Sequence, residues 1–180
     1  CIVCTITGGV TQNVNLFHSF EEFSISDGGE AFFDSADVIV NIFARVTGNN
    51  LSEVNGSIGT NDANLLLLNP NGIVFLENAE LNVEGSFLAT SADYVDFGNE
   101  GQFSIDTLQI PSLLNITTPI GLGFGANPGP IEVLPSLTAV DPVELVSAID
   151  NSTLALVGGE LLIDFADLIV ESGRIELGSV

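Results

Sequence analysis

The middle of the chain alternates short apolar segments with corners made of turn-forming residues. Four apolar segments follow one another at residues 65–68, 73–76, 81–83 and 87–90, and each is too short for a helix. The residues between them include Asn, Pro and Gly, which favour turns because Pro fixes φ while Gly and Asn tolerate positive φ. The pattern therefore predicts short β-strands separated by sharp corners.

These segments also repeat at a regular distance. If three strands form one coil, the fourth strand lies above the first, so Leu65 and Phe87 are one coil apart, a distance of 22 residues. Near the C-terminus, Leu154 and Ile175 begin equivalent segments 21 residues apart. A repeat of about 20–22 residues lies at the lower end of the solenoid range and predicts an all-β parallel β-helix. Each coil would hydrogen-bond to its neighbours, and Asn and Ser at the corners would add side-chain bonds between coils.

Two regions depart from the repeat. The N-terminal third is irregular, as expected for a cap that hides the first edge of a solenoid. Six of the seven prolines lie between Gly98 and Asn151, which indicates an excursion from the coil. The predicted single domain, residues 1–180, divides into a cap region with the first coils at 1–60, regular coils at 61–106, the excursion at 107–150 and further coils at 151–180.

Two local patterns add detail. The unbroken leucines at 65–68 predict a strand that is covered on both faces, with an extra packed segment outside the coil. Within the excursion, Asp141, Pro142 and Glu144 have the order of an N-cap, a first-turn proline and an N3 acid. They predict one short helix in an otherwise irregular excursion.

Charge excludes several classes of partner. The chain has 2 Lys and Arg residues against 24 Asp and Glu residues, for a net charge of −22, and its only cations are Arg45 and Arg174. Nucleic-acid binding needs several cations on the phosphate backbone, and anionic membranes need a basic surface. No apolar run reaches the length of about 20 residues that a membrane-spanning helix needs. Abundant Phe, Val, Ile and Leu distinguish the chain from acidic disordered segments.

Few residues suggest catalysis, a cofactor or a metal. His18 is the only histidine, and no nucleophile elbow accompanies it, so we expect a half-buried strand residue. Paired acids occur at Glu21 and Glu22, which are adjacent, and at Asp93 and Asp96, which are close in the sequence. A polysaccharide-cleaving β-helix usually also needs a cationic groove. The sequence therefore predicts no enzyme, no cofactor and no metal site.

The two cysteines, Cys1 and Cys4, leave alternatives open. A zinc site lacks further ligands, and a redox motif lacks a following helix and a nearby cation. The remaining interpretations are a local disulfide in an oxidising compartment or two free thiols in a first strand.

Several motifs together carry a resemblance. In chain order they are Asn15-Leu16-Phe17-His18-Ser19-Phe20 with Phe23, Arg45-Val46-Thr47-Gly48, Asn64-Leu65 with Asn69-Pro70-Asn71-Gly72-Ile73 and Phe75, and Gly85-Ser86-Phe87 with Ala89-Thr90. Their order and spacing resemble the N-terminal secretion domain of the filamentous haemagglutinin family, particularly its cyanobacterial-style members. Residues 156–159 and 173–178 resemble the segment that follows this domain in such proteins.

The resemblance implies two-partner secretion. A large adhesin or haemagglutinin-like exoprotein would pass through the periplasm and the outer membrane to the cell surface or the medium. An Omp85-type outer-membrane transporter with POTRA domains would recognise this domain, which would fold outside as a right-handed β-helix and act as a template for later coils. The residues that match the family's secretion-linked motifs are Asn69, Pro70, Asn71, Gly72, Asn15, Phe17, Phe20 and Phe23.

Each of these residues also has a structural interpretation, in which the asparagines cap a turn and the phenylalanines pack the cap. An alternative function is a structural β-solenoid subunit that stacks end to end with copies of itself into an extracellular fibre.

Overall fold

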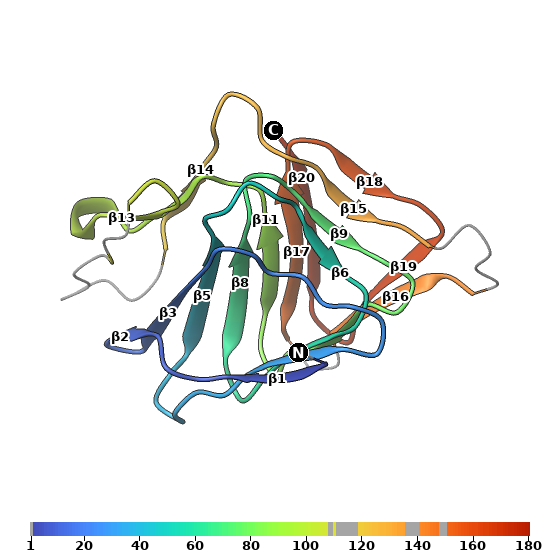
Figure 1. The fold of residues 1–180 in the computed structure, drawn as a ribbon, viewed down its shortest axis with the longest axis horizontal. Coiled ribbons are helices and arrows are strands. Elements are labelled where there is room, and N and C mark those ends of the chain that lie inside the picture. The colour runs from blue at the N-terminus through green and yellow to red at the C-terminus, as the bar shows by residue number, and fades with distance from the viewer. Residues whose placement is uncertain (1, 108–109, 111–118, 136–140, 148–150) are drawn as a thin grey trace.

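The computed structural model of the protein describes residues 2–107, 110, 119–135, 141–147 and 151–180. Within these residues the chain consists of β-strands and one short 3-10 helix, η1 (Gly98–Glu100). The strands wind around one axis into a solenoid whose coils pair mainly in parallel (Figure 1). The predicted all-β parallel β-helix is therefore confirmed.

One side of the solenoid is a seven-stranded sheet. In spatial order its strands are β2 (Val10–Gln12), β3 (Asn15–Phe20), β5 (Asn41–Val46), β8 (Asn64–Leu68), β11 (Phe87–Thr90), β17 (Thr153–Gly158) and β20 (Arg174–Ser179). Every neighbouring pair is parallel except β2 with β3, which is antiparallel. The sheet therefore begins with one strand of opposite direction and continues as six parallel strands.

The register of this sheet confirms the repeat that the sequence predicts. Leu65 pairs with Phe87, and Leu154 pairs with Ile175. Phe87 pairs in turn with Leu154, although 67 residues separate them. The coil therefore resumes in register after the excursion.

The other two sides are made of shorter strands. A second side contains β1 (Val3–Ile6), β4 (Glu30–Phe33), β7 (Ser57–Thr60) and β10 (Glu80–Asn82), followed by the separate parallel pair of β16 (Val143–Ser147) and β19 (Ala166–Val170). The third side contains β6 (Ser52–Val54), β9 (Ile73–Phe75), β15 (Ile131–Val133) and β18 (Leu161–Ile163).

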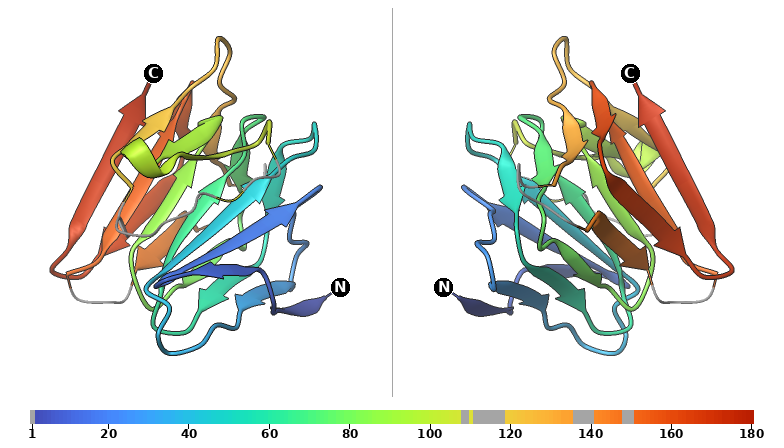
Figure 2. Two further views of the ribbon diagram at one scale, coloured as in Figure 1. Left: turned by 90° about the vertical axis from the view of Figure 1, so that its left-hand side faces the viewer. Right: turned by 90° about the vertical axis from the view of Figure 1, so that its right-hand side faces the viewer.

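A small antiparallel sheet lies outside the coil. Its strands are β12 (Tyr94–Asp96), β13 (Gln102–Ser104) and β14 (Gly121–Gly123), with β12 in the middle. We call the described residues from β12 to β14 the excursion, which begins before residue 107 and ends before residue 150. The excursion lies against the outer face of the seven-stranded sheet (Figure 2). The chain then returns to the coil at β15, which pairs with β9.

Apolar side chains consequently form two cores. An inner core fills the axis of the solenoid, and an outer core lies between the seven-stranded sheet and the excursion. Leu65 and Leu67 belong to the inner core, and Leu66 and Leu68 belong to the outer core. The prediction that this strand is covered on both faces is confirmed.

The helix predicted from Asp141 and Pro142 is wrong. Residues 143–147 form β16, in which buried Val143 and Leu145 flank exposed Glu144. This period of two fits a strand that turns alternate side chains into the inner core, and β16 pairs along its whole length with β19. Pairing with the next coil outweighs the local capping signal.

Among the described residues, no helix combines the length and apolar character needed to cross a bilayer. Cys4 is part of a disulfide, and Cys1 lies outside the described residues.

Candidate functional site

Six of the eight predicted site residues lie at one corner of the solenoid, where the chain leaves the seven-stranded sheet. Asn69, Pro70, Asn71 and Gly72 connect β8 to β9, and we call this turn the NPNG corner. Phe20 and Phe23 lie at the same corner in the first coil, where β3 ends. The four NPNG residues and the two phenylalanines are far apart in the sequence, but the winding of the coil brings them to the same edge of the solenoid.

Asn69 is the most deeply held residue of the NPNG corner. It is fully buried, and its Nδ2 donates to the backbone oxygen of Asn50 and to Oγ of Ser52, both at 3.0 Å. Its Oδ1 accepts the backbone N–H of Asn71 at 3.0 Å. The side chain therefore closes its own turn and fastens it to the preceding coil.

Asn71 and Gly72 bring the same turn close to its two neighbouring coils. Nδ2 of Asn71 donates to the backbone oxygen of Gly48 at 2.9 Å. Gly72 has φ of +114, and a Cβ there would lie 2.7 Å from the backbone oxygen of Pro130. Only glycine fits this position, because the next coil approaches closely and the backbone is left-handed.

The amino-terminal motif reaches this corner through Gly48. The amide of Gly48 donates to the backbone oxygen of Glu21 at 3.0 Å, while its own oxygen accepts from Asn71. The rings of Phe20 and Phe23 lie 5.4 Å apart in or against the inner core. One chain of hydrogen bonds thus connects the end of the first motif, the second coil and the NPNG corner.

Phe17 lies apart from this corner. It points to the opposite face of β3 and stacks on Phe43 at 5.1 Å between ring centroids, within the outer core. Phe17 and Phe20 therefore pack in different cores, because an odd number of positions separates them along the strand.

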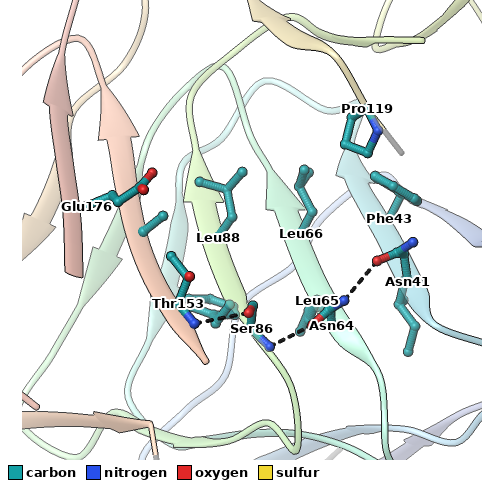
Figure 3. A pocket seen from close by; sticks show the side chains of 13 residues that line it. Asn41, Phe43, Asn64, Leu65, Leu66, Ser86, Leu88, Pro119, Thr153 and Glu176 are labelled. Atoms are coloured by element: carbon teal, nitrogen blue, oxygen red, sulfur yellow. Dashed lines mark hydrogen bonds between the residues drawn. The ribbon is translucent and has the colours of Figure 1, made fainter. Parts of the chain in front are cut away.

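Asn15 belongs to a ladder at the opposite corner of the sheet. Asn41 donates to Asn15 at 2.8 Å, and Asn64 donates to Asn41 at 2.9 Å. Asn64 then accepts the amide of Ser86, and Oγ of Ser86 accepts the amide of Thr153 (Figure 3). The expected hydrogen bonding between coils is confirmed, and its signal in the sequence is the Asn that begins each of the strands β3, β5 and β8.

Two hollows lie near these features. A polar hollow of about 710 Å³ adjoins the NPNG corner, and its charged side chains, Glu22 and Glu53, are both acids. An apolar hollow of about 300 Å³ lies beside the Asn ladder, on the outer face of the sheet (Figure 3). In the described part of the chain, the first hollow offers mainly hydrogen bonds and negative charge, and the second offers mainly apolar contact.

Arg45 has a role that the sequence does not reveal. It is 1% exposed, and its Nε donates to Oγ of Ser19 at 2.8 Å. Its Nη1 donates to the backbone oxygens of Ser104 and of Thr107, and the guanidinium lies 4.3 Å from the ring centroid of Phe103. Burial lowers the pKa of Arg45. Arg45 therefore joins the coil to the excursion.

The remaining candidates for chemistry do not assemble a catalytic group. His18 lies on strand β3 as predicted, but it is 6% exposed and therefore more buried than the predicted half-buried residue. Arg174 pairs with Glu176 at 2.9 Å on the surface, so the described arginines form no common groove. Within the described ranges, no three His, Cys, Asp or Glu side chains gather in a way that could hold a metal ion.

Comparison with known proteins identifies the family to which this chain is similar. The family model described as "TPS secretion domain" matches residues 3–180. A heme/hemopexin-binding protein of Haemophilus influenzae (strain ATCC 51907 / DSM 11121 / KW20 / Rd) is 36% identical over 74 residues, and a second protein of that name from Haemophilus influenzae is 34% identical over 74 residues. The aligned segment covers 41% of this chain and 8% of each relative. No solved structure matches the chain significantly.

Proposed function

Because the chain belongs to the TPS secretion domain family, we propose that it is the secretion and folding-template domain of a large, haemagglutinin-like adhesin. The proposed route runs through the periplasm and the outer membrane to the cell surface or the medium. The proposed partner is an Omp85-type outer-membrane transporter with POTRA domains. The domain has no catalytic step in this scheme.

The observation that carries the template role is the difference between the two ends of the solenoid. At the N-terminal end, antiparallel β2 covers the edge of β3. At the other end, β20 is the last strand of its sheet among the described residues. The last coil exposes six large apolar side chains, which are Leu162, Phe165, Ile169, Ile175, Leu177 and Val180. A further coil in the same parallel register would pair with β20 and bury apolar surface.

Transporter recognition is proposed for the NPNG corner and the amino-terminal motif. The internal hydrogen bonds of Asn69 favour a structural role for its side chain, since it is buried and bonded to the preceding coil. Pro70 and Asn71 are partly exposed and line the polar hollow. We therefore expect Pro70 and Asn71 to be the more direct contacts.

The proposal does not extend the binding activity in the relatives' names to this chain. Those names refer to heme and hemopexin, and the aligned segment is 8% of each relative.

An export assay tests the recognition role. The chain is co-expressed with its candidate transporter, and the fraction that reaches the medium is measured for Pro70→Ala, Asn71→Ala and the double variant Asn69→Ala/Asn71→Ala. The matched control is Asn82→Ala, which removes a different amide bond between coils, from Asn82 to Ser57. Urea unfolding of each purified variant separates loss of recognition from loss of folding.

We expect Pro70→Ala and Asn71→Ala to lower export while the purified proteins stay folded, and Asn82→Ala to be exported normally. Undiminished export of the double variant would contradict a role for the NPNG corner. If export falls in every variant only in proportion to its loss of folding stability, the NPNG corner has a purely structural role.

The exposed last coil also favours the second candidate function, self-assembly into a fibre. The same six apolar side chains that suit a following coil would suit a second copy stacked end to end. Electron microscopy of the purified chain distinguishes the two, because a fibre-forming subunit gives filaments at high concentration and a secretion domain gives single particles.

A further inference from the structure

The N-terminal end of the solenoid is closed by residues 2–12, which we call the cap segment. Its β1 pairs with β4, and its β2 pairs with β3. Between these strands, Gly9 has φ of +85, and a Cβ there would lie 2.8 Å from the backbone oxygen of Phe17 and 2.9 Å from Cε1 of His18. The backbone of the cap segment therefore lies directly against the ring of His18.

The other sides of the His18 ring are closed by aromatic side chains. The ring is stacked with Phe20 at a centroid distance of 6.0 Å and meets the edge of Phe33 at 5.5 Å. Its backbone is paired with buried Ala44 on β5. Nε2 of His18 is buried and has no hydrogen-bond partner among the described residues. The site thus suits a neutral imidazole, because no described residue accepts a hydrogen bond from the buried Nε2.

No neighbouring element supplies a charge that would compensate a protonated His18. The cap segment has no Asp, Glu, Lys or Arg. The chain after β3 carries Glu21 and Glu22, which are exposed, and β5 carries Arg45, which faces the outer core. On β4, partly buried Glu30 is paired with Val3, and exposed Asp34 follows that strand. In the described part of the chain, no hydrogen bond or ion pair joins any of them to the imidazole.

We propose that His18 makes the cap segment a pH-sensitive closure. The neutral ring packs under the cap segment and keeps it on the first coil, and a protonated ring displaces the cap segment toward solvent. The inference concerns the closed N-terminal end and is independent of transporter recognition.

The direction of the effect follows from proton linkage. Burial lowers the pKa of His18 from its ordinary value of 6.5, whereas a ring exposed by cap opening regains that value. The open form therefore binds protons more readily than the closed form, so closure is most stable above pH 6.5 and weakens as the pH falls toward the lowered pKa. One proton per opening event raises the opening constant by up to tenfold per pH unit. From pH 7.5 to pH 5.0 the increase reaches about 30-fold.

Hydrogen exchange of the whole chain measures this opening. Amide exchange in the cap segment is followed at pH 7.5 and pH 5.0, after correction for the intrinsic pH dependence of exchange, in the wild type, His18→Phe and His18→Gln. Amides of β8 serve as the internal control for global unfolding. Glu30→Gln is the matched control, because it removes the carboxyl of a partly buried residue whose backbone pairs with the cap segment. An NMR titration of the His18 ring gives its pKa in the folded wild type.

We expect the wild-type cap to open up to about 30-fold more at pH 5.0, with β8 unchanged, and both His18 variants to lose this dependence while Glu30→Gln keeps it. The proposal is overturned if either His18 variant retains the wild-type dependence or if Glu30→Gln abolishes it. It is also overturned if the cap amides do not respond to pH, or if the ring titrates in the folded protein at or above 6.5. The ring titration decides the question even where a variant fails to fold.

Discussion

Asn69 is the side chain on which the NPNG corner depends most. Its amide reaches two groups of the preceding coil and also closes the turn that contains Asn71. Asn69→Ala removes the bond to the oxygen of Asn50 and leaves Oγ of buried Ser52 without this donor, so we expect a loss of about 2–3 kcal/mol in the free energy of unfolding.

Urea unfolding checks this expectation against Asn82→Ala. Asn82 is exposed and makes one amide bond between coils, so its loss should stay within about 0.5 kcal/mol, as for most surface substitutions. Equal losses at both positions would mean that burial of the corner adds nothing.

Arg45 allows a second prediction at the scale of one residue. Its guanidinium donates to Ser19 on the coil and to the oxygens of Ser104 and Thr107 on the excursion. Arg45→Met keeps most of the apolar volume and removes these bonds, and we expect it to cost about 2–4 kcal/mol because the buried carbonyl of Ser104 loses its charged donor. Arg45→Lys should recover only part of this loss, because one ammonium cannot reproduce the spread of the guanidinium. Full recovery by Lys would show that charge alone matters.

Among the elements, the antiparallel excursion depends on aromatic packing in the outer core. Phe103 on β13 is fully buried and lies 4.9 Å from Phe17 between ring centroids. Phe103→Ala should cost about 3–5 kcal/mol, as for other buried phenylalanines. The loss should appear first as faster amide exchange at Val95, which pairs with Phe103, while β8 keeps its protection. Phe32→Ala, at a half-exposed position of β4, is the control and should cost less. Similar losses at both positions would contradict a separate outer core.

The strands of the coil could be predicted from the sequence because their signal is local and repeats. Apolar segments at a spacing of 21–22 residues mark β8 with β11 and β17 with β20, and the observed register follows that spacing. The run of leucines in β8 likewise predicts burial on both faces. These signals need no knowledge of which distant residues meet.

The excursion and the details of the NPNG corner depend on distant residues. β12 pairs with both β13 and β14, and nothing in the short segments fixes that choice. A capping pattern at Asp141 predicts a helix, but the pairing of β16 with β19 imposes a strand. The motif identifies Asn69 and Asn71 as candidates, yet their partners Asn50 and Gly48 come from the preceding coil and follow only from the register.

For the whole molecule, the dominant electrostatic term is repulsion. The chain carries a net charge of −22, and the described residues contain one ion pair, Arg174 with Glu176, whose side chains are 72% and 52% exposed. An exposed pair contributes little, whereas many like charges on a compact fold repel one another over the range of a Debye length of about 10 Å at 0.1 M salt. Raising NaCl from 20 mM to 300 mM should therefore stabilise the protein, on the order of 1 kcal/mol, because salt screens the repulsion. Urea midpoints at the two concentrations measure the effect, and KCl should act equally if screening is the cause. A fall in stability with salt would mean that favourable ion pairs outweigh the repulsion between carboxylates.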